Sequence, residues 1–165
     1  MYLTPGRAMA ADLFHSPVVL YHASTERREA AWAAYRRGDW VLAMYLAGLA
    51  VEAILQAVAL NDDPTHDAKH DLPKWLARCR TSLQEALKDK GARECWNHVC
   101  RVWRNELRYL SRDGLLGYLR ARELNRGISG GADAIMKVNA VRLIESAVVI
   151  HNRGVTAWHH YTKKS

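Results

Sequence analysis

The amino-acid sequence predicts an all-α protein, an antiparallel bundle of four to five helices formed by residues 1–165 as a single domain. Alanine and leucine recur at helical spacing over long segments, and turn and capping residues separate these segments. No segment shows the sustained period-two alternation of a half-buried strand. A chain of this length can bury most of the surface that its unfolded form exposes, so it can fold without disulfide or metal staples.

The first predicted helix follows an N-terminal extension, residues 1–22, whose structure the sequence leaves open because Pro17 and other breakers interrupt it. An alanine-rich helix is expected from Ser24 or Thr25 to Arg37. Gly38 ends this helix at the position where a left-handed residue costs least.

Asp39 is the expected cap of a second helix, Trp40 to about Leu60, in which leucines and alanines alternate at helical spacing. Small residues keep one side of this helix thin, which allows another helix to approach closely: Ala43, Ala47, Gly48 and Ala50. Because only Gly38 and Asp39 separate the two helices, they are expected to form an antiparallel hairpin.

Residues 61–70 form a polar loop, and a third helix is predicted after the capping residue Asp71, extending to about Leu87. A fourth, basic helix is predicted over residues 92–110. Residues 111–131 contain five glycines and read as a mostly irregular basic loop. A fifth helix is expected over residues 132–152, and residues 153–165 read as a C-terminal tail.

The net positive charge of the chain comes entirely from its second half. Residues 1–90 hold 11 Lys and Arg against 11 Asp and Glu, whereas residues 91–165 hold 13 against 6, which accounts for the net charge of +7. A polyanion such as RNA can bind such a surface and release its counterions, although a basic face also serves solubility. The expected RNA-binding residues are Arg101, Arg104, Arg108, Arg120, Arg122 and Arg126.

The cysteines and the apolar segments indicate a cytoplasmic protein. Cys79, Cys95 and Cys100 are odd in number and form no C-x-x-C pair, so neither a disulfide framework nor a zinc ribbon is predicted. The longest apolar run, residues 41–51, is too short to span a bilayer, and no export signal stands out, so no membrane association is expected. No metal and no cofactor are predicted.

Three blocks of sequence resemble the HEPN family, small helical-bundle domains of RNA-targeting and defence systems. The first block is Tyr45 to Leu55, which contains Glu52 within small and apolar residues, and the second is His70-Asp71-Leu72. The third extends from Trp96 to Tyr109 and ends in Trp-Arg-Asn-Glu-Leu-Arg-Tyr. The resemblance spans residues 24–150 and implies a homodimer in a defence or toxin–antitoxin setting.

The resemblance also implies a metal-independent endoribonuclease site built from an Arg-x(4–6)-His motif of each subunit in a shared cleft. Arg93 and His98 fit this spacing. Arginine would hold the phosphate with its fixed fork of donors, while the imidazole would move the proton during attack by the ribose 2′-hydroxyl. The predicted catalytic residues are therefore Arg93 and His98, and whether the chain is an enzyme stays open.

Two other alignments of the motif remain open. Arg104 can align with the family arginine, which places Tyr109 at the histidine position and makes the site inactive. Arg153 and His159 near the C-terminus offer a third match. An inactive HEPN module would act through protein–protein interaction, as the partner of a nucleotidyltransferase or within a defence complex.

Glu52 needs solvent or a partner because it lies in an otherwise apolar helix. It is predicted either to lie on an exposed edge or to orient one arginine of the fourth helix, namely Arg93, Arg101 or Arg104.

Overall fold

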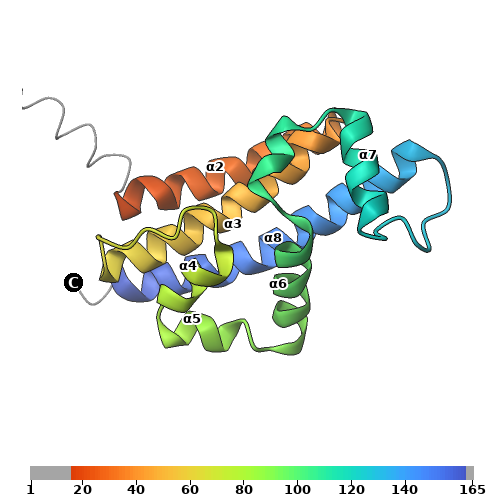
Figure 1. Ribbon diagram of the computed structural model, residues 1–165. Coiled ribbons are helices and arrows are strands. Elements are labelled where there is room, and N and C mark those ends of the chain that lie inside the picture. The colour runs from red at the N-terminus through yellow and green to blue at the C-terminus, as the bar shows by residue number, and fades with distance from the viewer. Residues whose placement is uncertain (1–15, 163–165) are drawn as a thin grey trace, which may run out of the picture.

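The computed structural model describes residues 16–162, and all regular secondary structure in this range is helical (Figure 1). The all-α prediction is therefore confirmed. The elements are α2 (Pro17–Arg36), α3 (Trp40–Asp62), α4 (Leu72–Arg78), α5 (Thr81–Ala86), α6 (Lys90–Val102), the 3₁₀ helix η1 (Asn105–Tyr109), α7 (Arg112–Ala121) and α8 (Ala132–Thr162).

The antiparallel hairpin of α2 and α3 is confirmed, and the residues that form it are the predicted ones. Gly38 adopts a φ of +76°, which is unfavourable for any residue with a Cβ atom. The Asp39 side chain accepts a hydrogen bond of 3.1 Å from the Leu42 amide and so caps α3. A turn of three residues, 37–39, thus reverses the chain between two long helices.

The prediction that all helices pack antiparallel is wrong for α3 and α8, which run in the same direction (Figure 1). Gly154 of α8 lies against Ile54 of α3, where an added Cβ atom would be 2.5 Å from Ile54 Cγ1. The chain between α3 and α8 forms several short helices on one side of the long ones, and this connection returns it to the end where α3 began. Such a crossover allows parallel neighbours, whereas a short loop does not.

Several predicted boundaries need correction. The extension 1–22 is too long, because α2 already begins at Pro17, a residue that fits the first turn of a helix; residues 1–15 lie outside the described range. In the segment 111–131, α7 occupies the first half with Ser111 as its cap, which is more helix than predicted, and the second half consists of turns and irregular chain. Residues 153–162 of the predicted tail continue α8 as regular helix.

The third and fourth predicted helices are each interrupted. Cys79 has the extended ψ of 155° and separates α4 from α5, while its thiol donates to the Leu55 carbonyl of α3. Trp103 has a ψ of 139° and ends α6, because its indole turns back onto α3 and donates a hydrogen bond of 3.1 Å to the Tyr45 carbonyl. Tertiary contacts of these two side chains therefore override helix propensity, and seven α-helices replace the predicted four or five within residues 16–162.

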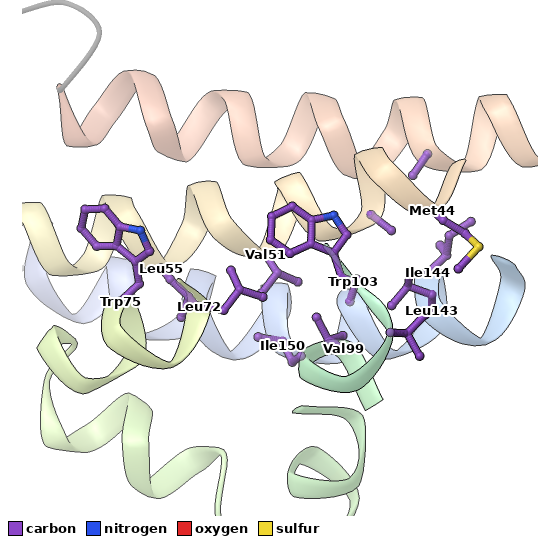
Figure 2. Packing of buried hydrophobic residues seen from close by; sticks show 14 of the residues in the cluster. Met44, Val51, Leu55, Leu72, Trp75, Val99, Trp103, Leu143, Ile144 and Ile150 are labelled. Carbon is purple, nitrogen blue, oxygen red and sulfur yellow. The ribbon is translucent and has the colours of Figure 1, made fainter. Parts of the chain in front are cut away.

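The hydrophobic core extends along α3, which α2, α8 and the short helices surround (Figure 1). Gly48 lies directly beneath the Trp103 indole, and an added Cβ atom there would overlap the ring. The thin side of α3 thus receives the bulkiest side chain of the core. Figure 2 shows core residues from one end of this cluster to the other: Trp75, Leu55, Leu72, Val51, Trp103, Val99, Ile150, Leu143, Ile144 and Met44.

By length and composition alone, α3 could also cross a membrane, which the short apolar run in the sequence did not suggest. Its most apolar window has a mean hydropathy of 1.9, but 67% of that window is buried inside the bundle. This degree of burial is that of a core helix in a globular domain.

Candidate functional site

Arg93 and His98, the predicted catalytic pair, lie on different faces of α6. Arg93 lines a pocket with residues of α4 and α5, including Leu76 and Gln84. His98 lines a second pocket with residues of α8, including Arg142. Within one chain the structure therefore does not bring the two side chains together, and a shared site would require a second subunit.

His98 is also poorly placed for proton transfer. Its Nε2 is shielded from solvent and has no hydrogen-bond partner among the described residues. Burial lowers the pKa of the imidazole, and the nearby charges of Arg142 and Arg101 lower it further. His98 is thus a neutral, half-buried side chain at physiological pH, and Arg142 is the arginine that shares its pocket.

The two alternative motifs do not form paired sites either. Arg104 lies between α6 and η1 and donates to the Cys100 carbonyl of α6, whereas Tyr109 at the end of η1 is 73% exposed and lies beneath the Arg108 guanidinium. Arg153 forms an ion pair of 3.3 Å with Asp89, while His159 lies 3.3 Å from the Tyr21 hydroxyl on α2. The members of each motif contact different elements.

Glu52 is buried and contacts a histidine, so both predictions for this residue are wrong. Only 6% of Glu52 is exposed, and its two carboxylate oxygens lie 3.0 and 3.2 Å from Nδ1 of His70. Gln56 donates a further hydrogen bond of 3.1 Å to Oε1. Burial raises the pKa of the Glu52 carboxyl, and the contacts with His70 partly offset this rise.

The His70 pocket, with a volume of about 530 Å³, lies between the start of α4 and the junction of α6 with η1. All three sequence blocks of the HEPN resemblance meet here. His70 of the second block lines the pocket, Glu52 of the first block lies behind His70, and residues 100–106 of the third block form the opposite wall. The polar residues that line it are Lys69, His70, Asp71, Lys74, Cys100, Arg104, Asn105 and Glu106. Burial raises the pKa of the Cys100 thiol to about 11, so this thiol is protonated at neutral pH.

Several of the predicted RNA-binding arginines stabilise helix ends. Arg101 donates to the Arg122 carbonyl at the end of α7, and Arg122 donates to the Arg101 carbonyl near the end of α6, each over 3.0 Å. Arg104 donates to the last carbonyls of α6. These cations satisfy backbone acceptors that a helix terminus leaves unpaired. Arg126 forms an ion pair with Glu123.

Three arginines line the Trp40 pocket, which has a volume of about 620 Å³. Arg37 from the end of α2, Arg108 from η1 and Arg112 from α7 surround it. Trp40 and Tyr45 of α3 line the same pocket. Asp39, its acidic residue, already accepts the capping hydrogen bond of α3.

Sequence reasoning predicted Arg108 for this surface but missed Arg37, Arg112 and the pairing of Glu52 with His70. Arg37 belongs to the half of the chain without net charge, so charge counting overlooked it. The triplet His70-Asp71-Leu72 contributes to the resemblance, but that resemblance does not pair His70 with Glu52. A buried carboxylate that needs a hydrogen-bond donor was the available signal for a partner such as His70.

Residues 16–162 contain no group of three or more His, Cys, Asp or Glu side chains placed to hold a metal ion.

Comparisons of the chain with protein-family models, curated proteins and solved structures find no match.

Proposed function

We propose that the chain is an HEPN-like RNA-binding protein that contacts single-stranded RNA through the Trp40 pocket. The observation that carries this proposal is the convergence of Arg37, Arg108 and Arg112 from three separate segments on one pocket lined by aromatic residues. Backbone phosphates favour guanidinium donors, and bases stack on exposed aromatic rings.

The surroundings of the pocket support the same function. Tyr109 is exposed beside it, and the Arg108 guanidinium lies 4.7 Å from the Tyr109 ring centroid. An arginine stacked on a tyrosine forms a flat polar–aromatic platform that accepts a base without sequence preference. Arg112 is paired with Asp133, but both side chains are largely exposed, so a phosphate can compete with this carboxylate for the guanidinium.

The test is the salt dependence of binding to a fluorescent single-stranded RNA of about 20 nucleotides, measured by anisotropy. Affinity is expected to fall steeply with rising KCl concentration. Each of Arg37→Gln, Arg108→Gln and Arg112→Gln should flatten the logarithmic slope by about 0.7, the value for one contact with a single-strand phosphate.

Arg78→Gln is the matched control, because Arg78 is an exposed arginine on α4, near the end of α3 that lies far from Trp40 (Figure 1). It should leave the slope unchanged. Absence of binding at low ionic strength, or equal effects of Arg78→Gln and the three pocket variants, would contradict the proposal.

A catalytically silent module that binds a protein partner is the second candidate function. The shielded Nε2 of His98 and the separation of Arg93 from it favour this alternative over an Arg93–His98 nuclease within one chain. A protein that shows no affinity for RNA but retains a stable fold would support it.

A further inference from the structure

The contact between Glu52 and His70 has the geometry of an oriented proton-transfer group. The Nδ1 atom of His70 lies between both oxygens of a buried carboxylate, and Gln56 helps to hold that carboxylate. The His70 side chain is 47% exposed, in contrast to the 8% of Glu52. One edge of the imidazole is therefore fixed inside the protein, while the rest of the ring is open to solvent.

We propose that His70 is the proton-transfer residue of a phosphodiester-cleaving site in the His70 pocket, with Glu52 as its positioning residue and Arg104 as the phosphate-binding group. This inference rests on the proposed RNA binding. It assigns proton transfer to a histidine outside the Arg-x(4–6)-His motif and phosphate binding to Arg104, the arginine of one alternative alignment of that motif.

The carboxylate determines which nitrogen of His70 reacts. A nitrogen placed between two carboxylate oxygens donates its hydrogen to them, so Nδ1 carries the proton. In the neutral ring the Nε2 lone pair is then free to accept a proton. This is the relation between the carboxylate and the imidazole in serine-hydrolase triads, where the acid fixes the tautomer and the orientation of the base.

Arg104 is fixed for phosphate binding in a comparable way. Its Nη1 donates to the carbonyls of Cys100 and Trp103 over 2.7 and 2.6 Å, which orients the planar guanidinium at the wall of the pocket. Two of its three nitrogens make no hydrogen bond within the described chain, and they can donate to phosphate oxygens. Lys69, an exposed residue of the same pocket, adds a positive charge.

The His70 pocket and the Trp40 pocket share one short element. Arg104, Asn105 and Glu106 line the first pocket, whereas Arg108 and Leu110 line the second. A 3₁₀ helix rises by about 2 Å per residue, so Arg104 and Arg108 lie roughly 8 Å apart along η1. An RNA strand held at the Trp40 pocket can therefore continue over η1 and place a neighbouring phosphate beside Arg104.

The reaction needs no external reagent. Nε2 of His70 takes the proton of a ribose 2′-hydroxyl, and the 2′-oxygen forms a bond to the adjacent phosphorus. The bond from phosphorus to the 5′-oxygen breaks, and that oxygen takes up the proton from the imidazolium, directly or through a water molecule. The products are a 2′,3′-cyclic phosphate and a free 5′-hydroxyl, and His70 returns to its starting state.

Other groups in the pocket are less suited to this step. The Cys100 thiol stays protonated, as its raised pKa requires. Asp71 already accepts from the Lys74 amide and ammonium groups, which lower the pKa of its carboxyl. Glu106 is exposed, so its carboxylate is solvated.

The experiment measures binding and cleavage separately on the full chain, with a mixed-sequence single-stranded RNA and the same strand in 2′-deoxy form as probes. The decisive variant is His70→Asn, because the Asn amide can donate to Glu52 in place of Nδ1 and so preserves the fold, but it cannot accept a proton. Cleavage is expected to fall by about 100-fold or more, with RNA affinity unchanged. The deoxy strand should bind but remain intact.

Glu52→Gln keeps the size and the acceptor of the side chain, and it should lower kcat while KM stays within about twofold, as expected of a group that acts through His70. His160→Ala, at an exposed histidine of α8, is the control and should cut like the wild type. Circular dichroism verifies that each variant is folded.

The two proposals fail in different ways. If the wild type binds RNA but does not cut it, or if folded His70→Asn cuts as fast as the wild type, the inference is overturned and the RNA-binding function stands. If no RNA binds at low salt, both are overturned. If His98→Ala abolishes cleavage and His70→Asn does not, the catalytic residue is His98.

Discussion

His151 is a buried titratable residue whose environment leaves no place for a charge. It is 1% exposed in the interface of α2 and α8, and its Nε2 lies 3.0 Å from the Ser24 hydroxyl. Ser24 donates its own hydrogen to the Tyr21 carbonyl, so its oxygen accepts from Nε2 of His151. Burial lowers the pKa of His151 to about 4, and the charge of Arg28 contributes.

This depressed pKa predicts a loss of stability in mild acid. Between the ordinary histidine value of 6.5 and about 4, the unfolded chain binds a proton at this position and the folded chain does not. The free energy of unfolding should therefore decrease as the pH falls through this window, by up to about 3 kcal/mol from this residue. Urea unfolding at a series of pH values measures the effect.

The control for this prediction is His151→Gln, whose amide can still donate to Ser24 but does not titrate. Its free energy of unfolding should change less between pH 6.5 and 4 than that of the wild type. A variant with the same pH dependence as the wild type would show that other groups cause the acid sensitivity.

Glu52 illustrates how far the sequence defines a single residue. Its apolar neighbours along the helix indicated that the carboxylate needs solvent or a partner, and in the folded chain the partner is His70. The partner could not be identified, because His70 lies 18 residues away across a loop whose path depends on the folded chain. Two of the arginines predicted to contact it, Arg101 and Arg104, instead donate to carbonyls at helix ends.

At the level of elements, Gly48 allows the closest approach in the core. The Trp103 indole occupies the space in which a side chain at position 48 would lie, and the ring belongs to the buried hydrophobic cluster. Since the ring is buried and hydrogen-bonded to the Tyr45 carbonyl, it cannot move aside without loss of packing.

Gly48→Ala is therefore expected to destabilise the protein by about 3 kcal/mol, at the upper end of the usual cost of overpacking. Gly117→Ala is the matched control, because Gly117 lies within α7 and an added Cβ atom there meets nothing within 4 Å. It should stabilise the protein by about 0.5–1 kcal/mol through helix propensity. Chemical denaturation compares the two, and a neutral Gly48→Ala would contradict the packing argument.

Elements defined by local chemistry were predictable, and those defined by tertiary contacts were not. Gly38 and Asp39 end one helix and cap the next through interactions within a few residues, so the α2–α3 hairpin followed from the sequence. Cys79 and Trp103 interrupt segments that have helical composition, because their side chains contact α3, which is distant in sequence. No local pattern reports such a contact.

At the level of the whole molecule, the homodimer stays a prediction of the HEPN resemblance. Among the described residues, the large apolar side chains that are exposed are Val18, Val19 and Tyr109, since α2, α8 and the short helices cover α3. The described residues therefore form no uncovered apolar helix that would favour association. A dimer would still matter for catalysis by the Arg93–His98 motif. These two residues lie in separate pockets of one chain, so only a second copy could place its Arg93 beside His98.

Light scattering over a wide range of concentrations tests this prediction. A dimer should give twice the chain mass of 18.7 kDa. A constant mass of 18.7 kDa would exclude a shared Arg93–His98 cleft and leave the His70 pocket, which is complete within one chain, as the remaining candidate for catalysis.

The parallel arrangement of α3 and α8 has a consequence for biosynthesis. During translation α3 leaves the ribosome long before α8, because residues 63–162 must still be added after it. At typical rates of elongation this takes roughly 5–20 s. During that time, the face of α3 that α8 covers in the finished protein stays uncovered. Nascent chains that end before α8 should therefore depend on chaperones to stay free of aggregation.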